Sequence, residues 1–234
     1  MRLRIGTSGF SYAPWRGSFY PADLAAERML AFYAARFDTV EINNTFYRMP
    51  AATALEGWAR EVPEGFGFAL KAPRYVVPKF VAAPDRADPV DAFFSLAALL
   101  GPKLGPALVT IPPSKVADAP LLAAFLDRFP KGRPIAVELR GPAWQTDEVL
   151  AVLREKNAAL CITDADDGTT PVVATGSFVY ARLRRTKYTR KDLAAWAKRL
   201  EGLGVGEAFV FFKHEDEGTG PRFAAALRAI VGGG

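Results

Sequence analysis

The stretch IAVELRGPAWQTDEVLAVLREKNAALCITD, residues 135–164, decides the fold prediction. Its two ends, Ile135–Arg140 and Ala159–Asp164, are short and rich in apolar residues, and Thr146–Lys156 between them has the spacing of an amphipathic helix. Two strands that are joined through a helix run parallel, because an antiparallel pair needs only a short turn. The stretch therefore predicts one strand–helix–strand unit.

The same alternation of short apolar runs and longer amphipathic segments extends in both directions along the chain. The predicted strands are Leu3–Ser8, Thr39–Asn43, Phe66–Lys71, Ala107–Ile111, Ile135–Arg140, Ala159–Asp164, Phe178–Leu183 and Glu207–Phe212. The predicted helices are Ala22–Arg36, Ala51–Glu61, Val90–Leu100, Pro120–Phe129, Thr146–Lys156, Arg190–Leu203 and Pro221–Val231. The pattern gives eight parallel strands with intervening helices, and eight is the number of strands that closes a TIM-type (β/α) barrel.

One connection departs from this pattern. Residues 165–177 are too few, and too rich in Gly, Asp and Thr, to form a full helix, so we expect an α/β barrel with the helix missing between strands six and seven. An open doubly wound sheet is the alternative, but no GxGxxG or GxxxxGK[ST] motif follows the first strand. No linker or low-complexity segment divides the chain, which predicts a single domain over residues 1–234.

Composition limits the chemistry. A single Cys, Cys161, excludes an internal disulfide framework, and a single His, His214, excludes sites that need two imidazoles. No stretch approaches the ~18 apolar residues of a membrane span, and Met1–Ile5 passes directly into a strand pattern without a signal-peptide run. We therefore expect a cytoplasmic protein that does not contact a membrane.

Charged residues gather where the predicted strands end, which is the functional end of a barrel. Alternation along a strand places Glu41 with Asn43, and Glu138 with Arg140, on the face that points to the barrel axis. Lys71, Asp164, Arg182 and Lys213 end four other strands. Buried charges are costly unless they are paired or serve a ligand. The set is therefore either a paired network, for instance Glu41 with Lys71 and Glu138 with Arg140, or a polar pocket.

If the pocket is catalytic, the two carboxylates Glu41 and Glu138 are the candidates for proton exchange, and Lys71 and Arg140 for stabilising negative charge. The candidate substrate-binding residues are Tyr12, Trp15, Asn43, Tyr47, Trp144, Asp164, Arg182 and Lys213. The aromatic members of this set follow the first, second and fifth strands and could form a stacking wall for a planar group. Core packing is the alternative for this cluster.

A basic segment, Arg182 through Lys191, contains six Lys and Arg residues and no acid. It follows the seventh strand, and the next loop offers Gly218–Pro221 at a helix start, so both lie where barrels commonly bind phosphate. These features favour an anionic ligand. No cofactor is indicated. Metal ligation by the strand-end acids is disfavoured, because cationic side chains neighbour them.

Several motifs together resemble the YecE-like family, known as domain of unknown function 72. The opening Gly6–Phe10 with Trp15–Pro21 and the block Glu41–Pro50 (EINNTFYRMP) carry most of this resemblance. Shorter matches are Gly67–Lys71, Pro112–Ser114, Val137–Arg140 with Trp144, and Asp164. The resemblance implies a TIM barrel and no particular activity. The chain departs from the family pattern at Val76–Pro78 and at Lys213–Glu215.

Three functions remain open on sequence grounds. The first is a metal-independent enzyme that acts on a small anionic substrate, phosphorylated or sugar-like, at the mouth of the barrel. The second is a binding module for a nucleotide or nucleic acid that uses the 182–191 loop, and the third is a metal-dependent hydrolase or nuclease. The sequence predicts neither the substrate nor the oligomeric state.

Overall fold

The computed structural model describes residues 1–83, 88–114 and 116–232. Its strands are β1 (Arg2–Thr7), β2 (Thr39–Ile42), β3 (Gly67–Lys71), β4 (Leu104–Ile111), β5 (Ile135–Leu139), β6 (Ala159–Ala165), β7 (Gly168–Thr169), β8 (Phe178–Leu183) and β9 (Glu207–Phe212). Its α-helices are α1 (Met29–Ala34), α2 (Ala52–Glu61), α3 (Val76–Ala82), α4 (Asp88–Ala97), α5 (Ala119–Leu126), α6 (Asp147–Glu155), α7 (Arg190–Glu201) and α8 (Thr219–Val231). Short 3₁₀ turns lie at Ala13–Trp15, Ala26–Arg28, Asn44–Phe46, Ala98–Lys103 and Pro142–Trp144.

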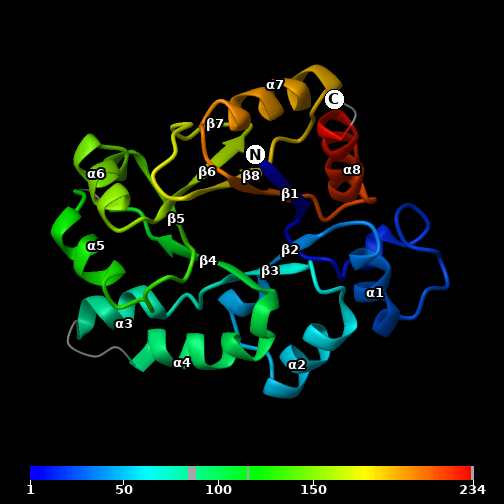
Figure 1. Cartoon of the computed structure of the whole chain (residues 1–234), viewed down its shortest axis with the longest axis horizontal. Coiled ribbons are helices and arrows are strands. Elements are labelled where there is room, and N and C mark those ends of the chain that lie inside the picture. The colour runs from blue at the N-terminus through cyan, green and yellow to red at the C-terminus, as the bar shows by residue number, and fades with distance from the viewer. Residues whose placement is uncertain (84–87, 115, 233–234) are drawn as a thin grey trace.

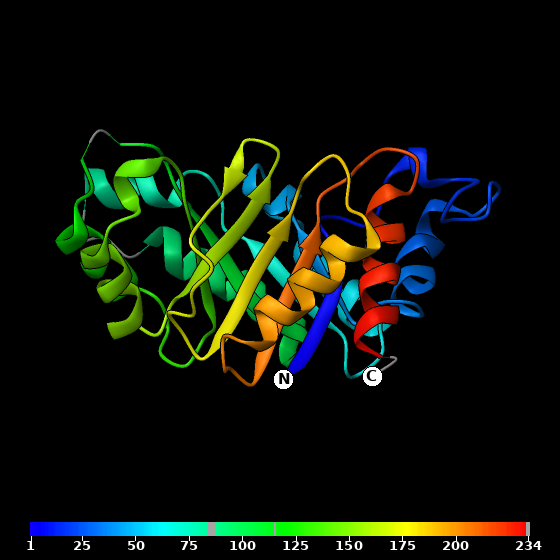
Figure 2. The same ribbon diagram turned by 90° about the horizontal axis from the view of Figure 1, so that it is seen from above.

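The strands form a nearly closed barrel surrounded by helices (Figure 1). Within the described residues, eight strands pair in parallel in the order β1-β9-β8-β6-β5-β4-β3-β2. Figure 2 shows β6, β8 and β9 side by side with their carboxyl ends toward one edge of the molecule and the N-terminus at the opposite edge. The predicted TIM-type fold is confirmed.

The connection between β6 and β8 contains no helix, as predicted. Residues 165–177 are all described, and they form a small hairpin in which β7 pairs antiparallel with the end of β6. Two helix predictions differ from the structure. Ala22–Arg36 is helical only from Ala26, and α3 was not predicted, because Pro78 interrupts a segment with little helical spacing.

The barrel closes between β1 and β2 through side chains and a single bridge. Ser8 and Glu41 form an isolated parallel bridge, and the Tyr33 hydroxyl fills the rest of the seam. This hydroxyl accepts hydrogen bonds from the Thr7 amide at 2.8 Å and the Thr7 hydroxyl at 2.9 Å, and donates to the Thr39 carbonyl at 3.0 Å. Gly6 permits the approach, because a Cβ at this position would overlap the Thr39 carbonyl oxygen.

We expect Tyr33→Phe to lower the free energy of unfolding by about 1–3 kcal/mol, because it leaves buried backbone groups of Thr7 and Thr39 without their partner. Urea denaturation measures this loss. Tyr75→Phe is the control, since Tyr75 is 38% exposed, and it should change the stability by less than about 0.5 kcal/mol. Equal stabilities for the two variants would show that the Tyr33 hydroxyl does not close the seam.

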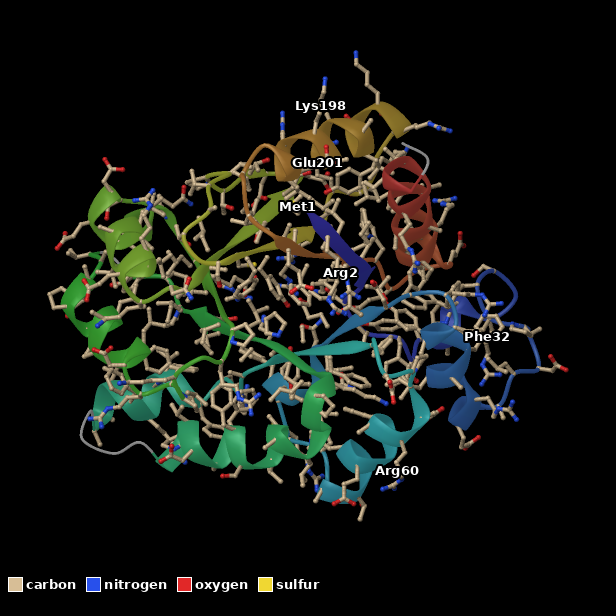
Figure 3. All side chains as sticks on the ribbon, viewed as in Figure 1. Met1, Arg2, Phe32, Arg60, Lys198 and Glu201 are labelled. Carbon is tan, nitrogen blue, oxygen red and sulfur yellow. The ribbon has the colours of Figure 1, made fainter. Side chains whose placement is uncertain are left out.

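The barrel interior combines small and large side chains. Alanine residues on β3, β5 and β6 leave space that aromatic residues on β8 and β9 fill. The members of this interior layer are Ala69, Leu108, Ala136, Ala159, Cys161, Phe178, Tyr180, Phe209 and Phe211. Figure 3 shows side chains filling the ring of strands, whereas Arg60 on α2 and Lys198 on α7 point outward. The packed interior leaves polar groups to the carboxyl end of the barrel.

No helix in the described part of the chain is both long enough and apolar enough to cross a membrane.

Candidate functional site

Strand alternation brings four charged side chains together inside the barrel mouth. Glu41 on β2, Lys71 on β3, Glu138 on β5 and Arg182 on β8 share the inward direction of the interior layer, and each residue is at most 5% exposed. They come from four strands that are spread around the barrel. The predicted convergence of these charges in one place is therefore present in the structure.

Arg182 connects the two carboxylates. Its Nε lies 2.9 Å from Oε2 of Glu41, and its Nη1 donates a hydrogen bond of 2.7 Å to Oε1 of Glu138. The Nε contact has the distance of an ion pair but not the angle of a hydrogen bond. The two attractive charges outweigh the effect of burial and raise the pKa of Arg182 above its usual range. Arg182 is thus fixed as a cation across the barrel.

Glu138 has the most partners. Besides Arg182, its Oε2 accepts from Thr110 Oγ1 at 2.8 Å and lies 3.2 Å from Lys71 Nζ and 3.4 Å from Arg140 Nη2. Burial would raise the pKa of Glu138, but the charges of Arg182 and Lys71 outweigh it and hold the pKa well below its usual range. Glu138 therefore stays ionised.

Glu41 is held by neutral donors as well as by Arg182. Ser8 Oγ donates to Oε1 at 2.8 Å, and the Tyr180 hydroxyl donates to Oε2 at 3.2 Å. Glu41 has no exposed surface. Its carboxylate oxygens thus both have partners, and a ligand cannot reach Glu41 without a rearrangement of the mouth.

Lys71 is the inward cation whose pKa is lowered rather than raised. Burial lowers its pKa, the nearby carboxylate of Glu138 opposes this effect, and the charge of Arg182 adds to the lowering. The Phe46 ring lies 4.7 Å from Lys71 Nζ and stabilises its charged form. The net effect is a lowered pKa, so Lys71 loses its proton at a lower pH than a free lysine does.

Three further polar groups form the rim of this network. The side chains of Arg140 and Lys213 are 48% and 35% exposed, and Lys213 has only a distant contact of 4.0 Å to Glu215. Burial and then the charges of Arg184 and Arg182 lower the pKa of Lys213. Asn43 Nδ2 is buried and has no hydrogen-bond partner among the residues that the structure describes. The rim thus offers donors and positive charge that the protein itself does not fully use.

The predicted aromatic wall has a different arrangement. Trp15 has no exposed surface and packs against Tyr12, with ring centroids 4.8 Å apart, so it belongs to the core. Tyr12 donates its hydroxyl proton to the Ser8 carbonyl at 2.8 Å. Trp144 is 6% exposed and donates to the Pro112 carbonyl at 3.1 Å, whereas Tyr47 is 71% exposed. Only Tyr47 presents an open ring to solvent.

Asp164 does not lie with the other predicted residues. On β6 it has the outward direction, toward α7, and its Oδ2 accepts from Tyr188 at 2.9 Å and from Trp196 at 3.0 Å. Thr169 donates to its Oδ1 at 2.7 Å, and Arg185 Nε lies 3.4 Å from Oδ2. Asp164 therefore fastens α7 and the 182–191 loop to the barrel.

The 182–191 loop is partly neutralised by nearby acids. Arg185 also lies 3.5 Å from Asp192, and Thr186 donates both its amide and its hydroxyl to Asp166. At the start of α8, the Thr219 amide donates to the backbone carbonyl of Asp216, and the acids of residues 215–217 precede the helix. The positive charge of the 182–191 loop is therefore partly balanced within the protein.

Ser8, Thr110 and Tyr180 belong to the network but were not predicted as site residues. Each has the inward direction on its strand, two residues from another inward position. Alternation alone could have placed them inside the barrel, but it does not distinguish an inward polar residue of the mouth from one that packs deeper. Within the described residues, no group of three His, Cys, Asp or Glu side chains is arranged to hold a metal ion.

Comparison with known proteins identifies relatives across nearly the whole chain. The model of the family described as "Protein of unknown function DUF72" matches residues 4–233. The UPF0759 protein YunF of Bacillus subtilis is 38% identical over 70 residues, which are 30% of this chain and 24% of that protein.

Solved structures agree with the fold. A DUF72 family protein from Thermotoga maritima superimposes with a TM-score of 0.86 at 23% identity, over 99% of this chain and 100% of that one. A DUF72 family protein from Enterococcus faecalis gives a TM-score of 0.81 at 20% identity, over 98% and 95%. A fusion protein with a xylose isomerase-like TIM barrel and a 4-hydroxyphenylpyruvate dioxygenase part gives 0.54 at 15% identity, over 98% of this chain and 42% of that one. The chain belongs to DUF72, a family of barrel proteins of unknown function.

Proposed function

We propose that the barrel mouth binds a small anionic molecule, phosphorylated or sugar-like, and that the protein acts on it as an enzyme without a metal ion. One observation carries this proposal. Two inward carboxylates, Glu41 and Glu138, are paired with the cations Lys71, Arg140 and Arg182. A fourth cation, Lys213, follows β9 at the same end of the barrel, and its side chain, like that of Arg140, remains partly exposed. An excess of positive charge at the functional end of a barrel favours an anion.

The geometry suggests different roles from those expected for two catalytic carboxylates. Glu138 is a poor proton acceptor, because three cations and Thr110 bind its ionised form. We assign proton transfer to Lys71 instead, since burial lowers its pKa. Glu41 and Glu138 then act as positioning residues, which hold Arg182 and Lys71 where negative charge develops.

The rim residues bind the anionic group of the substrate in this proposal. Arg140 and Lys213 supply charge, and Asn43 Nδ2 supplies a donor that has no partner within the described part of the protein. Tyr47 lies in the segment that follows Asn43, and its ring is exposed to solvent. This ring offers a surface for a planar or sugar-like part of the substrate.

A thermal-shift screen of phosphorylated metabolites, sugars and nucleotides tests the proposal, because a ligand that binds only the folded protein raises its melting temperature. We expect anionic compounds to raise the Tm. The double variant Arg140→Gln/Lys213→Gln should lose most of this shift, whereas Lys198→Gln/Arg199→Gln on exposed α7 should keep it. If the α7 variant loses the increase in Tm and the rim variant keeps it, the anion binds outside the barrel mouth.

Anion affinity should fall as the pH rises toward and through the lowered pKa of Lys213. The charged form of Lys213 binds the anion, and a lowered pKa means that this form is lost at a lower pH than for a free lysine. Titration calorimetry between pH 6 and pH 10 measures the effect on any ligand from the screen. Lys213→Arg, which stays charged, should remove the alkaline loss of affinity, and an unchanged pH profile in this variant would contradict the role of Lys213.

A further inference from the structure

A mostly apolar groove lies beside the candidate site. This groove of about 570 Å³ lies between α3 and α5, at the side of the barrel where β4 and β5 end. Its apolar lining includes Val77, Phe80, Ile111, Leu122, Phe125 and Trp144. The proposed function leaves this groove without a role.

The groove and the barrel mouth share one wall. The Arg140 amide donates to the Ile111 carbonyl at 3.1 Å, and Trp144 Nε1 donates to the Pro112 carbonyl at 3.1 Å, so the ends of β4 and β5 are joined there. Thr110 and Arg140 contact Glu138 on the mouth side of this wall. Ile111 and Trp144 line the groove on the other side.

The polar groups of the groove are largely occupied by the protein. Ser114 Oγ donates to the Val116 carbonyl at 2.8 Å, and Asp118 Oδ1 accepts from the Leu121 amide at 2.8 Å as the N-cap of α5. Apart from the exposed carboxylate of Glu148 in the lining, what remains open is mostly apolar. Val81 and Val116, which also line the groove, are 53% and 76% exposed. Exposed apolar side chains around a cavity indicate an apolar ligand.

We propose that the ligand is an amphipathic anion. Its charged head lies at Arg140 and Lys213, and its alkyl or aryl chain passes over the joined ends of β4 and β5 into the α3–α5 groove. This inference rests on the proposed function, because the head group uses the same rim. The inference adds that the affinity of the ligand depends on the length of its alkyl or aryl chain. The ligand is a dissolved single molecule, since its chain enters a cavity of limited volume.

A series of alkyl phosphates tests the inference. Ethyl, butyl, hexyl and octyl phosphate are titrated as monomers by calorimetry, with inorganic phosphate as the reference. Because burial of each methylene favours binding, affinity should rise along the series by up to about fourfold per CH₂ group. Equal affinities for ethyl and octyl phosphate would overturn the inference and leave the proposed function intact. Absence of binding by every member, inorganic phosphate included, would overturn both.

Two variants locate the chain. Val81→Gln/Val116→Gln makes the groove edge polar at exposed positions without changing its charge, so the fold and the rim should be preserved. We expect octyl phosphate to bind at least tenfold more weakly to this variant and ethyl phosphate to bind unchanged. Ala194→Gln/Ala195→Gln on the exposed face of α7 is the matched control. An equal loss in both variants, or no loss in the groove variant, would contradict a chain in the α3–α5 groove.

Discussion

Glu138→Gln will lower the free energy of unfolding by about 3–5 kcal/mol at neutral pH. The variant keeps the shape of the side chain but removes the charge that binds Arg182, Lys71 and Arg140, so the nearly buried Lys71 loses its carboxylate partner and Arg182 keeps only Glu41. Urea denaturation at pH 7 measures the loss. Arg140→Gln is the control, because the half-exposed side chain of Arg140 gives a pair worth only about 0–1 kcal/mol.

The pH dependence of this effect has a defined sign. The pKa of Glu138 is lowered in the folded protein, so its contribution is fully present above the unfolded pKa of about 4.3 and is lost as the pH falls toward the folded value. The difference in stability between the wild-type protein and Glu138→Gln that is present at pH 7 should therefore shrink in acid. A difference below about 1 kcal/mol at pH 7 would contradict a structural role for this carboxylate.

Arg182→Met will cost about 3–5 kcal/mol for the complementary reason. Without the guanidinium, Glu41 remains fully buried with only the hydroxyl donors Ser8 and Tyr180, whereas Glu138 retains Lys71. Urea denaturation at pH 8 measures this loss of stability.

A second substitution distinguishes the loss of an ion pair from a packing defect. Glu41→Gln in the Arg182→Met background removes the unpaired charge and should restore part of the lost stability at pH 8. A double-mutant cycle measured by urea denaturation gives the coupling between Glu41 and Arg182. Strictly additive losses would show that the 2.9 Å contact between them contributes nothing.

The inward direction of the site residues could be predicted from the sequence, because side chains alternate between the two faces of a strand. A period of two places Glu41, Glu138 and Arg182 inside the barrel once their strands are recognised, because a residue of the opposite parity faces the helices. The same rule could have shown that Asp164 faces α7, since Asp164 has the parity of Leu160 and Ile162 rather than that of Cys161.

The partners across the barrel could not be predicted in the same way. Of the two pairs that the sequence suggested, Glu138 with Arg140 is present at 3.4 Å. The other is not, because Glu41 pairs with Arg182, which also contacts Glu138, and Lys71 contacts Glu138. These contacts depend on how the strands are staggered and tilted around the axis, which the residue pattern of a single strand does not contain.

The burial of Trp15 in the core differs from the sequence prediction for another physical reason. Loop aromatics were expected to form a stacking wall, but the 3₁₀ turn at Ala13–Trp15 turns the indole into the core against Tyr12 and Phe19. Hydrophobic burial of a large aromatic ring is favourable wherever a turn permits it. Sequence alone does not show which aromatic residues of a loop are turned inward.

The most direct test of the account is a crystal structure with the strongest anionic ligand from the thermal-shift screen. We predict that the anionic group lies within hydrogen-bond distance of Arg140 and Lys213 and accepts from Asn43 Nδ2, while Arg182 still joins Glu41 and Glu138. An anion bound at the start of α8 or on the 182–191 loop, with the barrel mouth left unoccupied, would contradict it.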